Sequence, residues 1–436
     1  MRQSLFPSPS FFSVASIRLC YPLHFLSYPT ASRFSRVSPR AIGPWLMIMT
    51  MMALVVSLSG CGNWNFMKKK ETKTPATALV AFKPEVRLEK LWRENVGDNN
   101  DDPYVRLFPV VRDNRLFVAD MEGNVRAYDA RTGDALWKTD LKLPIRGGPG
   151  LGGNIVLVGT NDGEVVALSQ EDGRLLWKAR VSSEVLAMPR ERYGIVVVRT
   201  VDGKLFGLDA EDGKQRWVYE RSVPVLSLRG TSAPVFSRNV VAAGFDGGQL
   251  VAILLKEGIP VWETRIALPR GRFEIERMVD IDGELMVAGP IIYVVTFRGH
   301  VAAVDIRSGG TFWRREMSSH AGLGILGMSL YITDDKSHLW ALDRRSGEPL
   351  WQKTELAHRE LTAPVGFSPV GFGDYVAVGD SEGYLHLLDA GDGRMVGRIR
   401  ADKDGITSPP IVGGETDDIL YVYGRGGTLT AFRIRE

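Results

Sequence analysis

Residues 114–141 have the sequence NRLFVADMEGNVRAYDARTGDALWKTDL, and the same arrangement returns twice directly afterwards. The second copy, residues 154–181, is NIVLVGTNDGEVVALSQEDGRLLWKARV, and the third, residues 193–220, is YGIVVVRTVDGKLFGLDAEDGKQRWVYE. Each copy has a hydrophobic stretch, a polar turn with Gly, a short apolar stretch, a second Gly turn and a Trp. Internal repetition at such a period indicates a repeat architecture.

The repeat continues along most of the chain at fixed offsets. Its Trp recurs at Trp137, Trp177, Trp217, Trp262, Trp313 and Trp351. Four residues earlier lie Gly133, Gly173, Gly213, Gly258, Gly309 and Gly347, and eight residues earlier lie Asp129, Ser169, Asp209, Leu254, Asp305 and Asp343. A seventh copy has Asp389 and Gly393, with Gly397 where Trp is expected. Six matches at the same spacing are not a chance pattern.

The spacing of Asp, Gly and Trp is typical of β-hairpins. An Asp can cap a tight turn, and the Gly tolerates a positive φ. The large ring of the Trp can pack between neighbouring sheets. The apolar stretches are short, rich in β-branched residues and separated by regular turns, which predicts strands. Repeats of about 40–50 residues with four strands each are typical of propeller blades.

The two ends of the repeat region predict how the ring closes. The last copy, residues 418–436, stops before its own Gly-and-Trp strand, whereas Trp92 near the start has no repeat before it. An N-terminal strand that completes the last blade would remove the open edges. Residues 85–436 number 352, which is 44 for each of eight blades. The sequence therefore predicts an all-β, eight-bladed propeller of four-stranded blades, closed by the N-terminal strand.

The N-terminal region has the features of an export signal. Residues 41–58 are uncharged and strongly apolar, basic residues precede them, and Leu58-Ser-Gly-Cys61 follows. Small residues at this place mark a cleavage site, and the four residues resemble the lipobox of bacterial lipoproteins. That resemblance implies that residues 1–60 are removed, that Cys61 is lipidated, and that Gly62 directs the protein to the outer membrane. The alternative is a transmembrane anchor, since 18 apolar residues nearly span a bilayer.

Residues 61–84 contain a Lys cluster, Thr, Ala and Pro without sustained periodicity, which predicts a flexible tether.

The charge balance of the chain excludes one class of partner. Residues 1–60 hold five Arg and no acidic residue, so the remainder has 49 basic against 51 acidic residues. No basic footprint is left that would indicate a nucleic-acid-binding protein.

The repeats over residues 85–436 resemble the PQQ-like propeller repeat, and together with the lipobox the chain resembles the BamB family. Members are lipoproteins of the outer-membrane β-barrel assembly machinery. The segments that carry the resemblance are residues 226–234 (LSLRGTSAP), residues 274–282 with Asp280-Ile-Asp282, residues 361–364 and residues 379–386. The resemblance implies a scaffold without catalysis or cofactor that binds the periplasmic POTRA region of BamA, with nascent outer-membrane proteins as a further candidate partner.

The candidate partner-binding residues are Leu226, Leu228, Arg229, Asp280 and Asp282. They lie in the two longer connections between repeats: Trp217 to Gly247 spans 30 residues and Trp262 to Gly299 spans 37, against 26 for earlier repeats. Extra length in repeats maps to loops, often on the binding face. Ordinary roles compete with this interpretation: packing between blades for the leucines, turn capping for the aspartates and a solvated surface charge for the arginine.

An enzymatic alternative is a periplasmic quinoprotein or another small-ligand-binding propeller. PQQ-dependent dehydrogenases share the repeat and commonly carry adjacent cysteines, but this chain has only Cys20 and Cys61. Residues 322–327 match GxGxxG yet lead into a predicted strand, which is the wrong context for pyrophosphate binding. The histidines show no metal-ligand spacing, and residues 358–360 (HRE) lack the surrounding elements of a kinase catalytic loop.

Overall fold

The computed structural model describes residues 74–97, 106–224, 232–269, 271–414 and 417–435. The leader, Cys61, Leu226, Leu228 and Arg229 lie outside these residues. The described chain is built from strands, with one 3-10 helix, η2 (Glu274–Arg277). Within the described residues, no helix is both long enough and apolar enough to cross a membrane.

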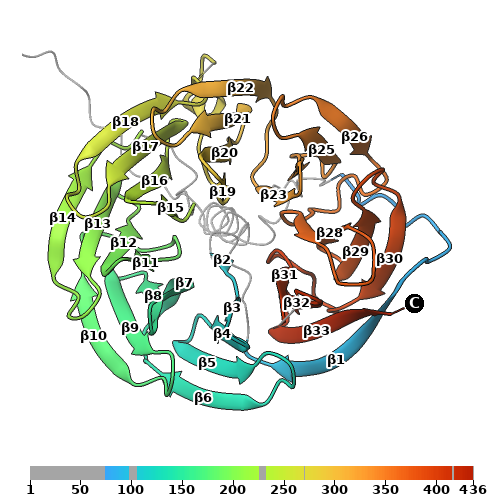
Figure 1. The fold of residues 1–436 in the computed structure, drawn as a ribbon, viewed down its shortest axis with the longest axis horizontal. Coiled ribbons are helices and arrows are strands. Elements are labelled where there is room, and N and C mark those ends of the chain that lie inside the picture. Colours follow the sequence, from blue (N-terminus) through green and yellow to red (C-terminus); the bar gives the residue numbers. More distant parts are fainter. Residues whose placement is uncertain (1–73, 98–105, 225–231, 270, 415–416, 436) are drawn as a thin grey trace, which may run out of the picture. The chain divides into compact units, whose positions relative to one another are not determined.

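The strands form eight sheets arranged around a centre (Figure 1). Blade 1 comprises β3 (Val110–Arg112), β4 (Arg115–Ala119), β5 (Asn124–Asp129) and β6 (Ala135–Asp140), and blade 2 comprises β7 (Ile145–Gly152), β8 (Ile155–Thr160), β9 (Glu164–Ser169) and β10 (Leu175–Arg180). Blade 3 comprises β11 (Arg190–Arg192), β12 (Ile195–Arg199), β13 (Lys204–Asp209) and β14 (Gln215–Glu220). Blade 4 comprises β15 (Val235–Ser237), β16 (Val240–Phe245), β17 (Gln249–Leu254) and β18 (Pro260–Arg265). A two-residue strand, β2 (Arg106–Leu107), pairs in parallel with β7.

Blades 5 to 8 complete the ring. Blade 5 comprises β19 (Met286–Ala288), β20 (Ile291–Val295), β21 (His300–Asp305) and β22 (Thr311–Glu316), and blade 6 comprises β23 (Leu323–Leu326), β24 (Ser329–Thr333), β25 (Leu339–Asp343) and β26 (Pro349–Lys353). Blade 7 comprises β27 (Val365–Phe367), β28 (Tyr375–Gly379), β29 (Tyr384–Asp389) and β30 (Met395–Arg400). Blade 8 comprises β31 (Ile411–Gly413), β32 (Ile419–Tyr423), β33 (Thr428–Arg435) and β1 (Arg87–Asn95). The predicted eight-bladed propeller is confirmed.

Burial along the strands follows from how blades stack. The middle strands are covered on both faces by neighbouring blades, so all six residues of β8 are buried. The outermost strands are covered on one face only, and β6 alternates between exposed and partly buried residues. The core is therefore divided among the junctions between blades, as in the cluster that joins β8 and β9 to β12 and β13.

A single contact recurs at the junctions between blades. The outer-strand Trp of one blade donates its Nε1–H to a carbonyl in the next blade's turn and lays its ring against that turn's Gly. Trp177, for example, donates to Ala210 O at 2.9 Å, and a Cβ on Gly213 would lie 2.6 Å from its ring. The donors are Trp92, Trp137, Trp177, Trp217, Trp262, Trp313 and Trp351, at 2.8–3.1 Å.

The turn that receives the Trp is built as its sequence predicts. Asp129 accepts hydrogen bonds from the backbone N–H of Arg131 and Thr132, and Gly133 adopts a φ of +81°. A β-bulge precedes the Trp on each outer strand, so that Leu136 of β6 is skipped by the pairing with β5. Such bulges twist an edge strand and disfavour pairing with another chain.

The exception at Gly397 has a physical reason. A Trp on β30 of blade 7 would need a turn in blade 8 between β33 and β1. No such turn exists, because these strands are the two ends of the repeat region and pair from Arg87↔Arg435 to Asn95↔Thr428. Instead Val86 lies against Gly397, where an added Cβ would be 3.3 Å from the Val86 side chain.

The N-terminal strand closes the ring as predicted. Trp92 of β1 is 8% exposed, donates to Ala130 O of blade 1 at 3.1 Å and packs against Tyr421 of blade 8. Residues 74–84, assigned above to the tether, lie against blades 6 and 7 and bond to Ala357, Arg359 and Arg398. The packed part of the chain thus begins before the predicted boundary at residue 85.

Replacing Trp92 tests the closure. Trp92→Ala should lower the free energy of unfolding by about 3–5 kcal/mol, because it removes a buried ring at the joint between the chain ends. Trp92→Phe keeps most of the ring and loses the donor, and should cost about 1 kcal/mol. Urea unfolding measures both. An Ala variant that unfolds at the wild-type urea concentration would show that this strand does not hold the ring closed.

Candidate functional site

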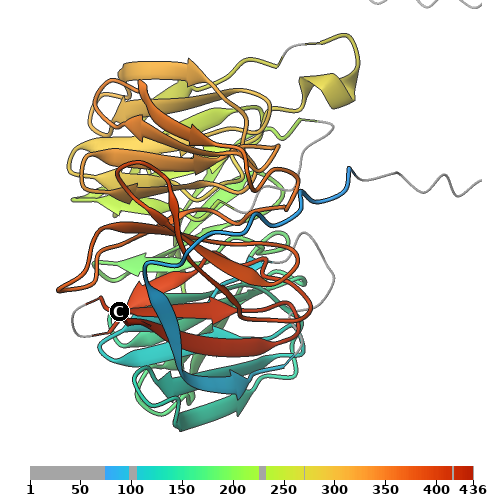
Figure 2. The same cartoon turned by 90° about the vertical axis from the view of Figure 1, so that its right-hand side faces the viewer.

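Two long connections between blades carry the predicted partner-binding residues. Residues 221–234 join β14 to β15, and residues 266–285 join β18 to β19 and contain η2. Figure 2 shows η2 projecting beyond the strands on one face of the ring. The described ends of the two connections meet, because Ala233 N donates to Glu284 Oε1 at 3.3 Å. Arg190 of blade 3 also contacts Glu284, at 3.3 Å.

Asp280 ties this connection to two blades. Its side chain is 1% exposed, and its Oδ1 accepts a hydrogen bond from Gly247 N in blade 4 at 3.0 Å. Its backbone forms a bridge with Asp246, and its carbonyl accepts from Phe297 N of blade 5 at 2.9 Å. A buried carboxylate is tolerated only when it is hydrogen-bonded, so Asp280 has a structural role in holding the loop.

Asp282 is also buried, at 5% exposure. Ile281 between the two aspartates is fully buried in the core of blades 4 and 5, where it meets Gly244, and a Cβ on Gly244 would be 2.3 Å from it. Of the two roles open for the aspartates, partner acceptor or loop support, the burial favours loop support. Turn capping, the ordinary role weighed in the sequence, accounts for Asp280.

A buried ion pair supports the same turn from blade 3. Arg199 of β12 is 3% exposed and contacts Asp246 at 3.3 Å. Its guanidinium also lies over the ring of Phe245, 5.4 Å from the centroid. The positive charge compensates the carboxylate of Asp246 directly beside the backbone that pairs with Asp280.

The exposed side chains of this connection are ones that the sequence reasoning missed. Leu268, Phe273 and Ile275 are 56%, 67% and 58% exposed. Glu276 accepts from the backbone N–H of Arg272 and Phe273, and Arg298 donates to the carbonyl of Ile275, so η2 is held in place. Clustered exposed apolar residues mark interaction surfaces. The alternation of apolar and charged residues in RFEIER was the available signal.

No metal-binding group is found in the described chain. Its His, Cys, Asp and Glu residues form no group of three or more that could hold a metal ion. The GxGxxG stretch contains the inner strand β23, in which a Cβ on Gly324 would lie 2.1 Å from Pro364 O. Gly324 permits the close approach of blade 6 to the chain that leads into blade 7.

A family model and several relatives match most of this chain. The family model described as outer membrane protein assembly factor BamB matches residues 89–147, 121–353 and 344–436. A BamB from Pseudomonas aeruginosa is 49% identical over 385 residues, which cover 88% of this chain and 98% of that protein. The crystal structure of BamB from Moraxella catarrhalis superposes with a TM-score of 0.70 at 28% identity, over 79% of this chain and 99% of that one.

A quinohemoprotein alcohol dehydrogenase from Pseudomonas putida superposes with a TM-score of 0.64. It is 13% identical, and the match covers 79% of this chain and 76% of that chain. At this identity the likeness shows a shared propeller fold and nothing further.

The role of Asp280 can be tested by stability alone. Asp280→Ala should lower the free energy of unfolding by about 1–3 kcal/mol, because Gly247 N loses its acceptor in a part-buried place. The matched control is Glu257→Ala, which removes an exposed acid from a turn of blade 4. Thermal unfolding of both variants is the measurement, and equal melting temperatures would contradict the structural role.

Proposed function

The chain belongs to the BamB family of outer membrane protein assembly factors, and from this premise we propose that it is a non-catalytic scaffold of the β-barrel assembly machinery. It docks on the periplasmic POTRA region of BamA and so assists the insertion of outer-membrane proteins. The family match over nearly the whole propeller carries this proposal.

The docking surface is centred on the two connections, residues 221–234 and 266–285. Leu226, Leu228 and Arg229 contribute apolar contacts and a forked, always-charged donor. Asp280 holds the second connection in shape. Rigid blades under both connections reduce the entropy lost on binding, since less chain must be ordered. Hot spots of interfaces are enriched in aromatic residues and Arg, which fits Arg229 together with the exposed Phe273.

A lipid on Cys61 keeps the protein at the periplasmic face of the outer membrane. Acylation at this cysteine, together with removal of residues 1–60, follows from the lipobox. Two or more acyl chains give stable membrane association where one chain gives only marginal binding. The anchor thus restricts the propeller to the surface where BamA resides.

The quinoprotein alternative receives less support. The dehydrogenase likeness lies at the level of fold, and the chain lacks the adjacent cysteines of that class. An absorption spectrum of the purified protein with a quinone chromophore would favour this alternative over the scaffold.

Binding to the POTRA region tests the docking surface. Leu228→Ala, Arg229→Ala and Phe273→Ala should each weaken the complex about thirtyfold, as truncation of a hot-spot residue costs about 2 kcal/mol. Leu136→Ala, on the outer strand of blade 1 and 47% exposed, is the matched control. Titration against the purified periplasmic region of BamA gives the dissociation constants. Folded variants that bind as tightly as wild type would place the interface elsewhere.

Replacing Cys61 tests the anchor. Cys61→Ala should leave the precursor uncleaved or the protein away from the outer membrane, because the thiol that accepts the diacylglycerol is gone. Mass spectrometry of the wild-type N terminus and membrane fractionation are the measurements. A wild-type protein that starts upstream of Cys61 and carries no lipid would contradict the assignment.

A further inference from the structure

The segment that precedes β1 is bound to the propeller. Residues 74–84, called the strap below, have no regular secondary structure. They lie beside blades 6 and 7 before the chain enters β1 (Figure 1). Leu79 packs against the core shared by blades 6 and 7. The contacts that hold the strap come mainly from two arginines.

Arg359 holds the strap at Thr77. Its Nη1 donates to the Thr77 carbonyl at 2.8 Å, while Thr77 N donates to Ala357 O at 3.1 Å. Arg359 is 1% exposed. Its neighbours His358 and Glu360 adopt φ values of +60° and +50°, a region that residues other than Gly rarely occupy. The connection between blades 6 and 7 is thus bent sharply where it turns Arg359 inward.

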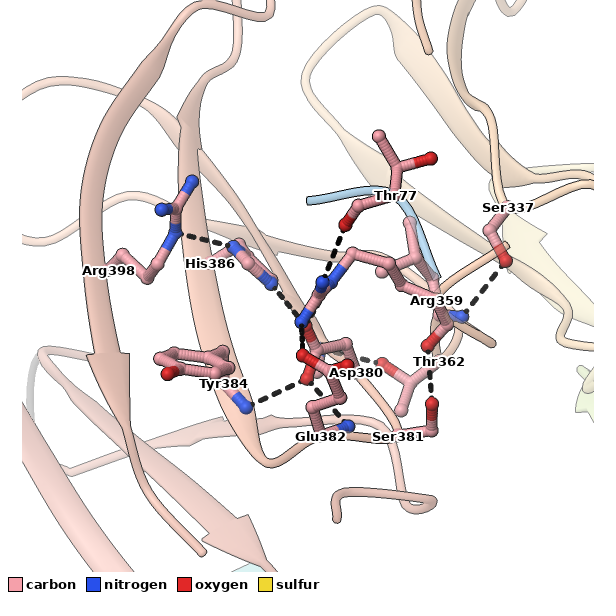
Figure 3. Close-up of polar contacts among 12 residues, drawn as sticks. Thr77, Ser337, Arg359, Thr362, Asp380, Ser381, Glu382, Tyr384, His386 and Arg398 are labelled. Atoms are coloured by element: carbon pink, nitrogen blue, oxygen red, sulfur yellow. Dashed lines mark hydrogen bonds and ion pairs between the residues drawn. The ribbon is translucent and has the colours of Figure 1, made fainter. Parts of the chain in front are cut away.

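Arg359 is held in turn by acidic residues of blade 7 (Figure 3). Its Nε donates to Asp380 Oδ2 at 2.7 Å, and its Nη2 donates to Glu382 at 2.5 Å. Asp380 is fully buried, and its Oδ1 accepts from the backbone N–H of Glu382 and Tyr384. Burial by itself raises the pKa of this carboxyl, but hydrogen bonds from His386, Tyr384 and Arg359 outweigh burial and leave the pKa below its ordinary value.

His386 connects this ion pair to the second arginine. Its Nε2 lies 2.7 Å from Asp380 Oδ2, and its Nδ1 accepts from Arg398 Nε at 3.2 Å. Burial lowers the pKa of His386, which is consistent with a neutral ring that donates on one side and accepts on the other. Arg398 then donates to the Val80 carbonyl of the strap at 3.1 Å and lies over the Phe82 ring.

The polar contacts that hold the strap are therefore two of its carbonyls and the N–H of Thr77. A cavity of about 150 Å³ remains beneath it, lined among others by Val80, Phe82, Leu356 and Leu388. Apolar packing alone thus does not fasten the segment. The carbonyl of Thr77 completes the hydrogen bonding of a buried guanidinium, and burying such a group without an acceptor is unfavourable.

Comparison with blades 1 and 6 shows that the equivalent aspartates there have other partners. Asp120 of blade 1 and Asp334 of blade 6 occupy the same turn position as Asp380. Asp120 Oδ2 accepts a hydrogen bond from the side chain of Asn124 in blade 1. Asp334 Oδ2 is hydrogen-bonded to the side chains of His338 and Trp340 in blade 6. Asp380 binds Arg359 from the preceding connection and, through it, the strap.

We propose that Arg359, Asp380, His386 and Arg398 form a clamp that fixes where the lipidated tether leaves the propeller. This role rests on the proposed lipidation of Cys61. With the strap bound, the linker between Cys61 and the first clamped residue is residues 62–76; without it, the linker is residues 62–84. At about 3.5 Å per extended residue, the reach is about 50 Å in the first case and about 80 Å in the second.

The clamp also sets a direction. Figure 2 shows the start of the strap and η2 extending to the same side of the ring. The clamp thus directs the start of the strap to the face that carries the proposed docking connection. A shorter tether raises the effective concentration of that face near a partner in the same membrane.

The first experiment measures the clamp without reference to lipid. Hydrogen exchange of the full-length protein in detergent should show the Thr77 amide, which donates to Ala357 O, protected in wild type. Arg398→Gln, which is too short to reach Val80, should speed exchange of this amide by about tenfold or more. Thr77→Pro removes the amide itself and serves in the second experiment. Arg394→Gln, an exposed arginine at the root of the strap, is the matched control. A Thr77 amide that is unprotected in wild type, or that exchanges as slowly in Arg398→Gln as in wild type, would overturn the clamp.

The second experiment measures its consequence. Lipidated protein labelled at Lys256→Cys is bound to phosphatidylethanolamine–phosphatidylglycerol vesicles that contain an acceptor lipid, and energy transfer reports the distance to the membrane. Thr77→Pro and Arg398→Gln should change this transfer, whereas Arg394→Gln should not. Faster strap exchange with unchanged transfer would overturn the positioning role. Wild-type protein that does not bind the vesicles would instead contradict the lipid anchor, while the exchange result would still show whether the strap is clamped.

Discussion

The propeller depends on the contact between a Trp ring and a Gly without a side chain. The ring lies where a Cβ would be, and the indole N–H reaches a carbonyl of the same turn. Each junction so formed needs three features at once: the Trp, the Gly and a turn that presents both Gly and carbonyl. Seven Trp residues make this contact, which explains why the repeat is recognisable at fixed offsets although most other positions vary.

The eighth junction shows what happens when the turn is missing. Blade 8 is made from both ends of the repeat region, so β33 and β1 have no connection that could receive a Trp from blade 7. The sequence accordingly has Gly397, and Val86 fills the space. Residues just before β1 are thereby drawn onto blade 7, and this places the strap on the surface where Arg359 and Arg398 hold it.

An aspartate stabilises the turn between the second and third strands in several blades, but its partners differ. Asp120 and Asp334 bind side chains of their own blades. Asp280 reaches the turn of blade 4 from a connection, and Asp380 binds Arg359 from the preceding connection. A rigid repeated framework permits this because its strands are fixed by stacking. The connections can then vary in length and in charge without loss of the ring, as in residues 266–285.

The sequence by itself determined the fold class, the number of blades and the ring closure, because each repeat carries close together the Asp-Gly turn that receives the preceding Trp and the Trp that enters the next turn. It also showed which connections are long. Only the tertiary structure decided that Asp280 and Asp282 are buried, that Phe273 and Ile275 are exposed, and that His358-Arg-Glu360 belongs to a clamp. The physical reason is that burial and pairing of these side chains depend on groups from other blades: Arg359 meets Asp380 and Thr77, which lie 21 and 282 residues away. No local pattern encodes such a meeting.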